Sequence, residues 1–252
     1  MCSVVILRRP NHAWPLLLAA NRDEMRDRPW DPPARHWSDR PEVIAGYDRL
    51  SGGSWLGLND HGVVAAVLNR SGSLGPAPDK RSRGELVLEA LDHADASEAA
   101  EQLRHLETGA YRSFNLFVAD NRDAFWLRST GHFNETVRVA KVTEGISMLT
   151  ARELNDLNSP RIARHLPLFQ SALAPDPDLD DWDAWKELLG TTGLGDPMDG
   201  MVVSDEKGFE TVSSSLIALP ESGLTLAGEP IQPIWLFAAG RPDRFPYQVI
   251  QI

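Results

Sequence analysis

The sequence predicts an α+β fold in which antiparallel sheets are covered by helices. Short apolar runs come in consecutive pairs joined by turn residues, as in β-hairpins. Helical patterns form separate groups, without the strand–helix alternation of parallel sheets. The run 63–68 is apolar without alternation, which indicates burial on both faces. Two stacked antiparallel sheets with helices outside, a four-layer αββα sandwich, satisfy these observations.

The first hairpin combines residues 3–8, a β-branched apolar run, with the apolar run 14–20. The turn Pro10-Asn11-His12-Ala13 separates them. Residues 21–28 are charged and lead into the proline-rich stretch 29–33, where regular structure is not expected. We therefore predict a long surface loop after the second strand.

The next elements are a short strand, a second hairpin and two helices. Residues 43–46 form the strand, and the runs 52–59 and 62–69 form the hairpin around a turn that ends in Gly62. The helices are predicted over 83–90, capped by Ser82, and over 98–106, capped by Ser97.

The remaining chain alternates hairpins and helices. Two hairpins pair 114–119 with 124–129, and 136–142 with 145–150. Ser159-Pro160 is typical of a helix start and predicts a helix to about residue 173. The last predicted elements are a short helix near 182–189 and strands over 211–219, 224–227 and 235–237.

Composition indicates an ordinary globular protein, and its length favours a single domain over 1–252. The formal net charge of −11, from 25 basic and 36 acidic residues, argues against a nucleic-acid surface. One cysteine excludes an intramolecular disulfide and fits a reducing compartment. With neither a membrane-spanning apolar run nor a signal-peptide pattern, we expect a cytoplasmic location and no membrane span.

Cys2, the single cysteine, directly follows Met1. Removal of Met1 would make it the N-terminal residue, with a thiol nucleophile and an α-amine of pKa about 7.7–8.0 that can take up the thiol proton. The alternative is a cysteine that packs as a small hydrophobic residue in a buried strand.

The first hairpin brings Asn21-Arg22-Asp23-Glu24 to the strand end that carries Cys2. There Arg22 could lower the thiol pKa and Asp23 could orient the amine. The alternative is a solvated strand end, and Asn121-Arg122-Asp123 repeats the tripeptide in a predicted turn. The indication therefore comes from the pairing with Cys2. Asn69, after a buried strand, is either an oxyanion donor or a strand terminator.

Other chemistries have little support in the sequence. The seven histidines show no spacing typical of a metal site. Gly52-Gly53 lacks the lysine of a phosphate-binding loop, and Ser213-Ser214-Ser215 is not a serine-hydrolase nucleophile elbow.

With these residues assembled, the chain resembles the NRDE family, whose animal members are called transport and Golgi organisation proteins. The resemblance rests on Met1-Cys2 with the following strand and on the segments 18–24, 52–57 and 62–69. That family is similar to N-terminal nucleophile hydrolases of the choloylglycine and penicillin V acylase type, which have an αββα sandwich and cleave non-peptide amides.

The resemblance implies roles for individual residues. Cys2 matches the nucleophile, Asp23 the amine-orienting aspartate and Asn69 an oxyanion-hole asparagine. Two positions depart from the acylase pattern. Where the acylases have an arginine this chain has Ala20, so Arg22 would have to serve, and their second asparagine falls near Ala151, with Asn155 the nearest substitute. Candidate substrate contacts are Asn21, Glu24, Trp55 and Asn155.

Two functions follow from this resemblance. The first is a cysteine amidohydrolase that acts on a small amide without a cofactor. The second is a carrier on the same scaffold, which binds haem or a lipid and in which Cys2 is a ligand or a vestige.

Overall fold

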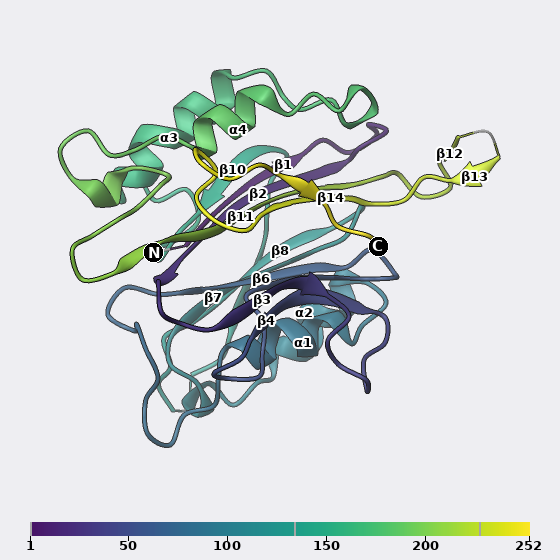
Figure 1. The fold of residues 1–252 in the computed structure, drawn as a ribbon. Helices are drawn as coiled ribbons and strands as arrows, with labels where there is room; N and C mark the ends of the chain where they lie inside the picture. The colour runs from purple at the N-terminus through teal and green to yellow at the C-terminus, as the bar shows by residue number, and fades with distance from the viewer. Residues whose placement is uncertain (1, 134, 227) are drawn as a thin grey trace. The chain divides into compact units, whose positions relative to one another are not determined.

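A computed structural model describes residues 2–133, 135–226 and 228–252 (Figure 1). The chain forms two compact units, each with its own sheet and core. The first unit contains the chain up to Arg28 and from Glu144 onward, and the second contains Pro29–Thr143. Two large antiparallel sheets with few helices confirm the predicted α+β class, whereas the single domain over 1–252 stays a prediction.

The first unit is built on a six-stranded antiparallel sheet in the order β10-β1-β2-β11-β14-β15. Its strands are β1 (Ser3–Arg8), β2 (Leu16–Met25), β10 (Gly145–Leu149), β11 (Phe209–Leu219), β14 (Ile234–Ala238) and β15 (Gln248–Val249). The helices are α3 (Pro160–Ser171), α4 (Asp183–Leu189), η2 (Pro177–Leu179) and η3 (Pro197–Asp199), and β12 (Thr225–Leu226) pairs with β13 (Glu229–Pro230). Apolar side chains of α3 and α4, among them Phe169 and Trp185, pack with those of β1 and β2 in one core.

The second unit is built on a seven-stranded sheet in the order β3-β4-β5-β6-β7-β8-β9. Its strands are β3 (Trp30–Ala34), β4 (Val43–Asp48), β5 (Leu56–Asn59), β6 (Val64–Asn69), β7 (Phe114–Ala119), β8 (Ala124–Ser129) and β9 (Arg138–Lys141). Its helices are α1 (Gly84–Leu91), α2 (Ala96–Arg104) and η1 (Thr108–Ala110). Apolar side chains of α1 and α2 form a core with those of β4, β6, β7 and β8.

Most predicted elements are present, but the predicted surface loop after the second strand is wrong. β2 continues through the polar tetrapeptide to Met25 because β11 pairs with it there, matching Glu210 to Glu24 and Thr211 to Asp23. Hydrogen bonding to a neighbouring strand thus overrides the polar composition.

The proline-rich stretch 29–33 also contains a strand, against the prediction. β3 lies at the edge of its sheet, and its register with β4 shifts between Asp31 and Ala34. Pro32 and Pro33 fall in that irregularity, where their missing N–H groups cost no ladder hydrogen bonds.

The predicted hairpin between 136–142 and 145–150 is wrong as well. β9 pairs with β8, and β10 pairs with β1, so the two strands belong to different sheets. Thr143 and Glu144, expected to form a tight turn, are the point where the chain passes from one unit to the other.

One predicted helix cap differs from that in the structure. Asp95, not Ser97, caps α2, by accepting a hydrogen bond from the Glu98 N–H at 2.8 Å. At α1, Arg83 occupies the residue before the helix and makes no side-chain cap hydrogen bond, but the hydroxyl of the predicted Ser82 accepts a hydrogen bond from the Gly84 N–H at 3.1 Å. Ser159 caps α3 as predicted. The predicted strand 224–227 appears as β12, and Ala227 lies outside the described residues.

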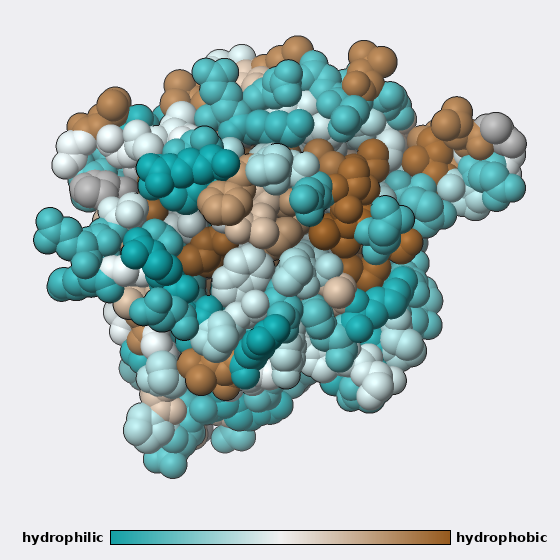
Figure 2. Space-filling view, in the orientation of Figure 1, coloured by the Kyte–Doolittle hydropathy of each residue, from teal (hydrophilic) through white to brown (hydrophobic). Residues whose placement is uncertain are grey.

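Polar side chains cover much of the face shown in Figure 2. In the part of the chain that the structure describes, no helix has both the length and the apolar character needed to cross a bilayer.

Candidate active site

The antiparallel pairing of β1 with β2 determines what lies beside Cys2. Ser3 pairs with Asn21, so the chain before Ser3 lies along Arg22 and Asp23. The Cys2 thiol donates a hydrogen bond to the main-chain carbonyl oxygen of Asp23, with a sulfur–oxygen distance of 3.7 Å. The structure therefore brings the only cysteine of the chain and Asp23 together.

The carboxylate of Asp23 is held by two side chains from other elements. Its side chain is fully buried, and Oδ2 accepts a hydrogen bond from Nη1 of Arg161 at 2.9 Å. Oδ1 accepts a hydrogen bond from the Thr211 hydroxyl at 2.7 Å. Asp23 lies on β2, Arg161 on α3 and Thr211 on β11. The carboxylate of Asp23 therefore links three elements beside the N-terminal end of β1.

Arg161 also contacts the strand that carries Cys2. Its Nη1 donates a second hydrogen bond, to the Ser3 hydroxyl at 2.7 Å. The buried charge of Asp23 is thus compensated by a buried arginine, as such groups require. Because Ser3 is covalently joined to Cys2, this contact helps to fix the backbone that presents the thiol.

The electrostatics of the site keep the thiol protonated at neutral pH. Burial raises the pKa of Cys2 above its usual value, and the negative charge of Asp23 raises it further. Arg22 acts in the opposite direction, as expected from the sequence, but its effect on the Cys2 pKa is smaller. A nucleophilic reaction of Cys2 therefore requires a base.

Asn21 is buried among backbone groups. Its side-chain amide donates hydrogen bonds to the carbonyl oxygens of Leu189 and Met201, at 3.0 and 2.9 Å. Its oxygen accepts a hydrogen bond from the Ser214 hydroxyl at 2.6 Å. These contacts fasten the segment between α4 and β11 to β2, and the predicted contact of Asn21 with a substrate stays a prediction.

The other predicted site residues are divided between the two units. Glu24 accepts a hydrogen bond from the Met25 N–H at 2.9 Å and lies 3.7 Å from Nε of Arg28. Asn155 bonds the backbone N–H of Met148 at 2.7 Å through its side-chain oxygen. Asn69, at the end of β6, and Trp55 belong to the second unit. Their predicted roles stay predictions.

Arg161 was not predicted as a site residue, although two features of the α3 sequence indicate that it needs a buried partner. Arg161 and His165 are four residues apart in a predicted helix, so they share one face, and both are buried. A cation in the first helical turn also opposes the helix dipole and needs a negative partner. The structure supplies that partner as Asp23.

A metal centre has no support in the described residues, in which no three His, Cys, Asp or Glu side chains group as metal ligands do. The groups that the structure places at this site are a thiol, a buried carboxylate and two arginines, Arg22 and Arg161.

Several solved hydrolases are similar to this chain in structure. The Caenorhabditis elegans N-acylethanolamine-hydrolyzing acid amidase ortholog matches with a TM-score of 0.57 and 12% identity, covering 85% of this chain and 92% of that protein. Penicillin V acylase from Agrobacterium tumefaciens matches with a TM-score of 0.54 and 12% identity, covering 100% of this chain and 98% of that protein. At this identity the similarity shows the fold alone: the chain has the fold of the N-terminal nucleophile hydrolases.

The chain belongs to the transport and Golgi organisation 2 family, whose model matches residues 1–211. The mouse homolog of that name is 37% identical over 114 residues, and the human one is 38% identical over 114 residues. Each match covers 43% of this chain and 40% of the relative, so the matched segment spans less than half of those proteins.

Proposed function

We propose that this protein is an N-terminal-cysteine amidohydrolase that acts on a C–N bond other than a peptide bond. The observation that carries the proposal is the contact between the Cys2 thiol and Asp23, whose carboxylate is buried and held by Arg161 and Thr211. The fold supports it, since the similar structures are named as an amidase, an acylase and a bile acid hydrolase. The bile acid hydrolase structure is that of the C2A mutant, in which alanine replaces a cysteine at position 2.

The proposed reaction uses groups beside the N-terminal end of β1. After removal of Met1, the Cys2 α-amine takes the thiol proton, and the sulfur attacks the carbonyl carbon of the amide. The C–N bond breaks, the leaving amine takes the proton from the α-ammonium group, and a thioester remains on sulfur. A water molecule, deprotonated by the α-amine, then attacks the thioester, which releases the carboxylic acid and returns the proton to sulfur.

Asp23 serves this reaction by orienting the α-amine, and Arg161 and Thr211 keep Asp23 in place. The raised pKa of the Cys2 thiol fits a mechanism in which the proton is transferred to the amine at the moment of attack. Asn69 and backbone N–H groups are proposed to stabilise the oxyanion. Asn21, Glu24, Trp55 and Asn155 are proposed to contact the substrate. We place the protein in the cytoplasm as part of the same proposal.

The test combines intact mass with thiol labelling. We expect the purified protein to lack Met1 and to react with iodoacetamide at pH 7 at least ten times faster than a form that retains Met1, because only the free amine can serve as base. In an assay of linear N-acyl amides, Cys2→Ala should abolish hydrolysis and Asp23→Asn should reduce it more than a hundredfold. Retention of Met1, or equal labelling rates of the two forms, would refute the mechanism.

The second candidate function is a carrier of haem or a lipid, which the family name favours because it refers to transport. In that case Cys2 is a haem ligand or a vestige and not a nucleophile. Titration with haem would then give a thiolate-type absorption band that disappears in Cys2→Ala, and the protein would hydrolyse none of the amides. The absence of that band, together with hydrolysis, would exclude the carrier.

A further inference from the structure

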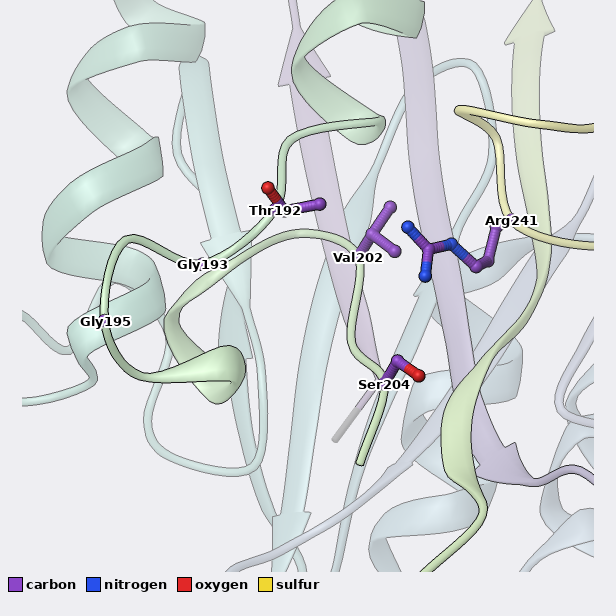
Figure 3. A pocket seen from close by; sticks show the side chains of 6 residues that line it. All are labelled: Thr192, Gly193, Gly195, Val202, Ser204 and Arg241. Carbon is purple, nitrogen blue, oxygen red and sulfur yellow. The ribbon is translucent and has the colours of Figure 1, made fainter. Parts of the chain in front are cut away.

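A cavity of about 330 Å³ lies in the first unit, beside the segment that Asn21 fastens to β2. Its walls come from the loop after α4, from the segment before β11 and from the turn after β14. The lining residues are Thr192, Gly193, Gly195, Val202, Ser204 and Arg241 (Figure 3). Its volume is at the lower end of the range for ligand sites, which suits a small molecule.

The loop that forms one wall is held in a fixed conformation. Asn21 bonds the carbonyl oxygens of Leu189 and Met201, near the two ends of the loop, and the Val202 N–H donates to the Thr191 carbonyl at 2.9 Å. A Cβ atom on Gly193 would lie 2.2 Å from the Asp196 carbonyl oxygen, so only glycine allows this close wrapping. The cavity is therefore formed before a ligand arrives.

Arg241 supplies the cavity with a positively charged donor. Its side chain is only 15% exposed, and in Figure 3 the guanidinium group points from the turn after β14 toward Val202 and Ser204. Nε and Nη2 donate to the two carboxylate oxygens of Asp243, at 3.0 and 2.7 Å. Nη1 has no hydrogen-bond partner among the described residues, and this leaves its donors available to a ligand.

Two arginines share one carboxylate at this wall of the cavity. Asp243, which accepts two hydrogen bonds from Arg241, also lies 3.9 Å from Nε of Arg244. The hydrogen bonds from Arg241 and the positive charges of both arginines hold the pKa of Asp243 below its usual value. Arg241 therefore shares its ion-pair partner with a second arginine, on a chain whose net charge is −11.

We propose that this cavity binds a small monocarboxylate, which accepts hydrogen bonds from Nη1 of Arg241 and from the hydroxyl groups of Thr192 and Ser204. Within the described part of the chain neither hydroxyl has a hydrogen-bond partner. One guanidinium nitrogen without a hydrogen-bond partner, on an arginine that is already paired with Asp243, suits a monoanion better than a phosphate dianion. This binding uses none of the thiol chemistry and does not depend on the proposed function.

The test uses the full chain with Cys2→Ala, so that no thiol reaction can interfere. Butyrate is titrated while ¹⁵N chemical shifts are recorded, with butyramide as the neutral ligand of nearly the same shape. We expect saturable shifts of Gly193, Gly195 and the Arg241 side chain with butyrate, and at least tenfold weaker binding of butyramide.

Two variants connect this binding to the cavity. Arg241→Gln should weaken butyrate binding at least tenfold, and Thr192→Val, which leaves the guanidinium group in place, should weaken it about threefold. Asp243→Asn is the matched control, because it removes a negative charge and should retain or strengthen binding. Equal binding of butyrate and butyramide, unchanged binding in Arg241→Gln, or tighter binding of inorganic phosphate than of butyrate would overturn the proposal.

Discussion

Asp23 is the residue on which the candidate site depends. Its carboxylate is fully buried, and its hydrogen bonds to Arg161 and Thr211 join β2 to α3 and β11. A buried ion pair contributes little net stability compared with apolar residues, but loss of one partner leaves the other charge buried without compensation. The pair therefore constrains the geometry around Cys2 more than it stabilises the fold.

Asp23→Asn should lower the free energy of unfolding by about 3 kcal/mol or more, because Arg161 stays buried without its counterion. Glu24→Gln, at the adjacent and partly exposed position, should change it by less than about 1 kcal/mol. Urea denaturation of the two variants measures both values.

The double variant Asp23→Asn with Arg161→Met tests the cause of this loss. It should cost less than the sum of the two single changes, because it leaves no buried charge unpaired. If Asp23→Asn lowered the free energy of unfolding no more than Glu24→Gln, the fold would not depend on the ion pair between Asp23 and Arg161.

At the scale of elements, β2 connects the candidate site with the cavity. Asn21 fastens the loop that lines the cavity, and Asp23, two residues further along, holds the site beside Cys2. β11 makes both possible, since it pairs with β2 along its whole length. The polar end of β2 is buried because its polar groups meet partners on neighbouring elements.

The cap of α2 provides a test of how this element begins. Asp95→Ala should lower the free energy of unfolding by about 1 kcal/mol, since it removes the hydrogen bond to the Glu98 N–H. Ser97→Ala is the matched control and should change it by less than about 0.5 kcal/mol, because the Ser97 side chain makes one exposed hydrogen bond with the described residues, to Asp123 at 3.3 Å. A larger effect of Ser97→Ala in thermal or urea unfolding would contradict the cap seen in the structure.

At the scale of the whole molecule, the first unit is discontinuous in sequence. Its strands β1 and β2 come from the beginning of the chain, whereas the strands on either side of this pair, β10 and β11, follow the second unit. The sheet of the first unit cannot form until the second unit has been synthesised, and its strand pairing closes a loop of more than a hundred residues. This topology favours unfolding of the chain as one cooperative system.

We therefore expect a single unfolding transition that responds to changes in either core. Phe169→Ala in the first unit should cost about 3–5 kcal/mol and Leu116→Ala in the second about 2–5 kcal/mol, both residues being fully buried. Each should shift the same transition, followed by tryptophan fluorescence and far-ultraviolet circular dichroism. Two transitions, each moved by only one of the variants, would contradict the single domain expected from the sequence.

The sequence by itself determined most of the local elements and the pairing of several neighbouring strands. The hairpin of β1 and β2, the strands β7 and β8, and the Ser159 cap of α3 follow from apolar periodicity and turn chemistry within a few residues. The proximity of Cys2 to Asp23 follows from that hairpin too. Such features depend on contacts that are close in sequence, where the residue pattern is informative.

Only the tertiary structure decided features that depend on distant partners. β2 extends through Asp23 because β11 lies beside it, and β9 and β10 separate because each finds a partner in a different sheet. Arg161 reaches Asp23 across 138 residues of sequence. A local pattern cannot specify such partners, since burial and pairing are satisfied by whichever segment the fold brings alongside. The closeness of Cys2 and Asp23 was therefore visible in the sequence, whereas Arg161 and Thr211, which hold the carboxylate of Asp23, were not.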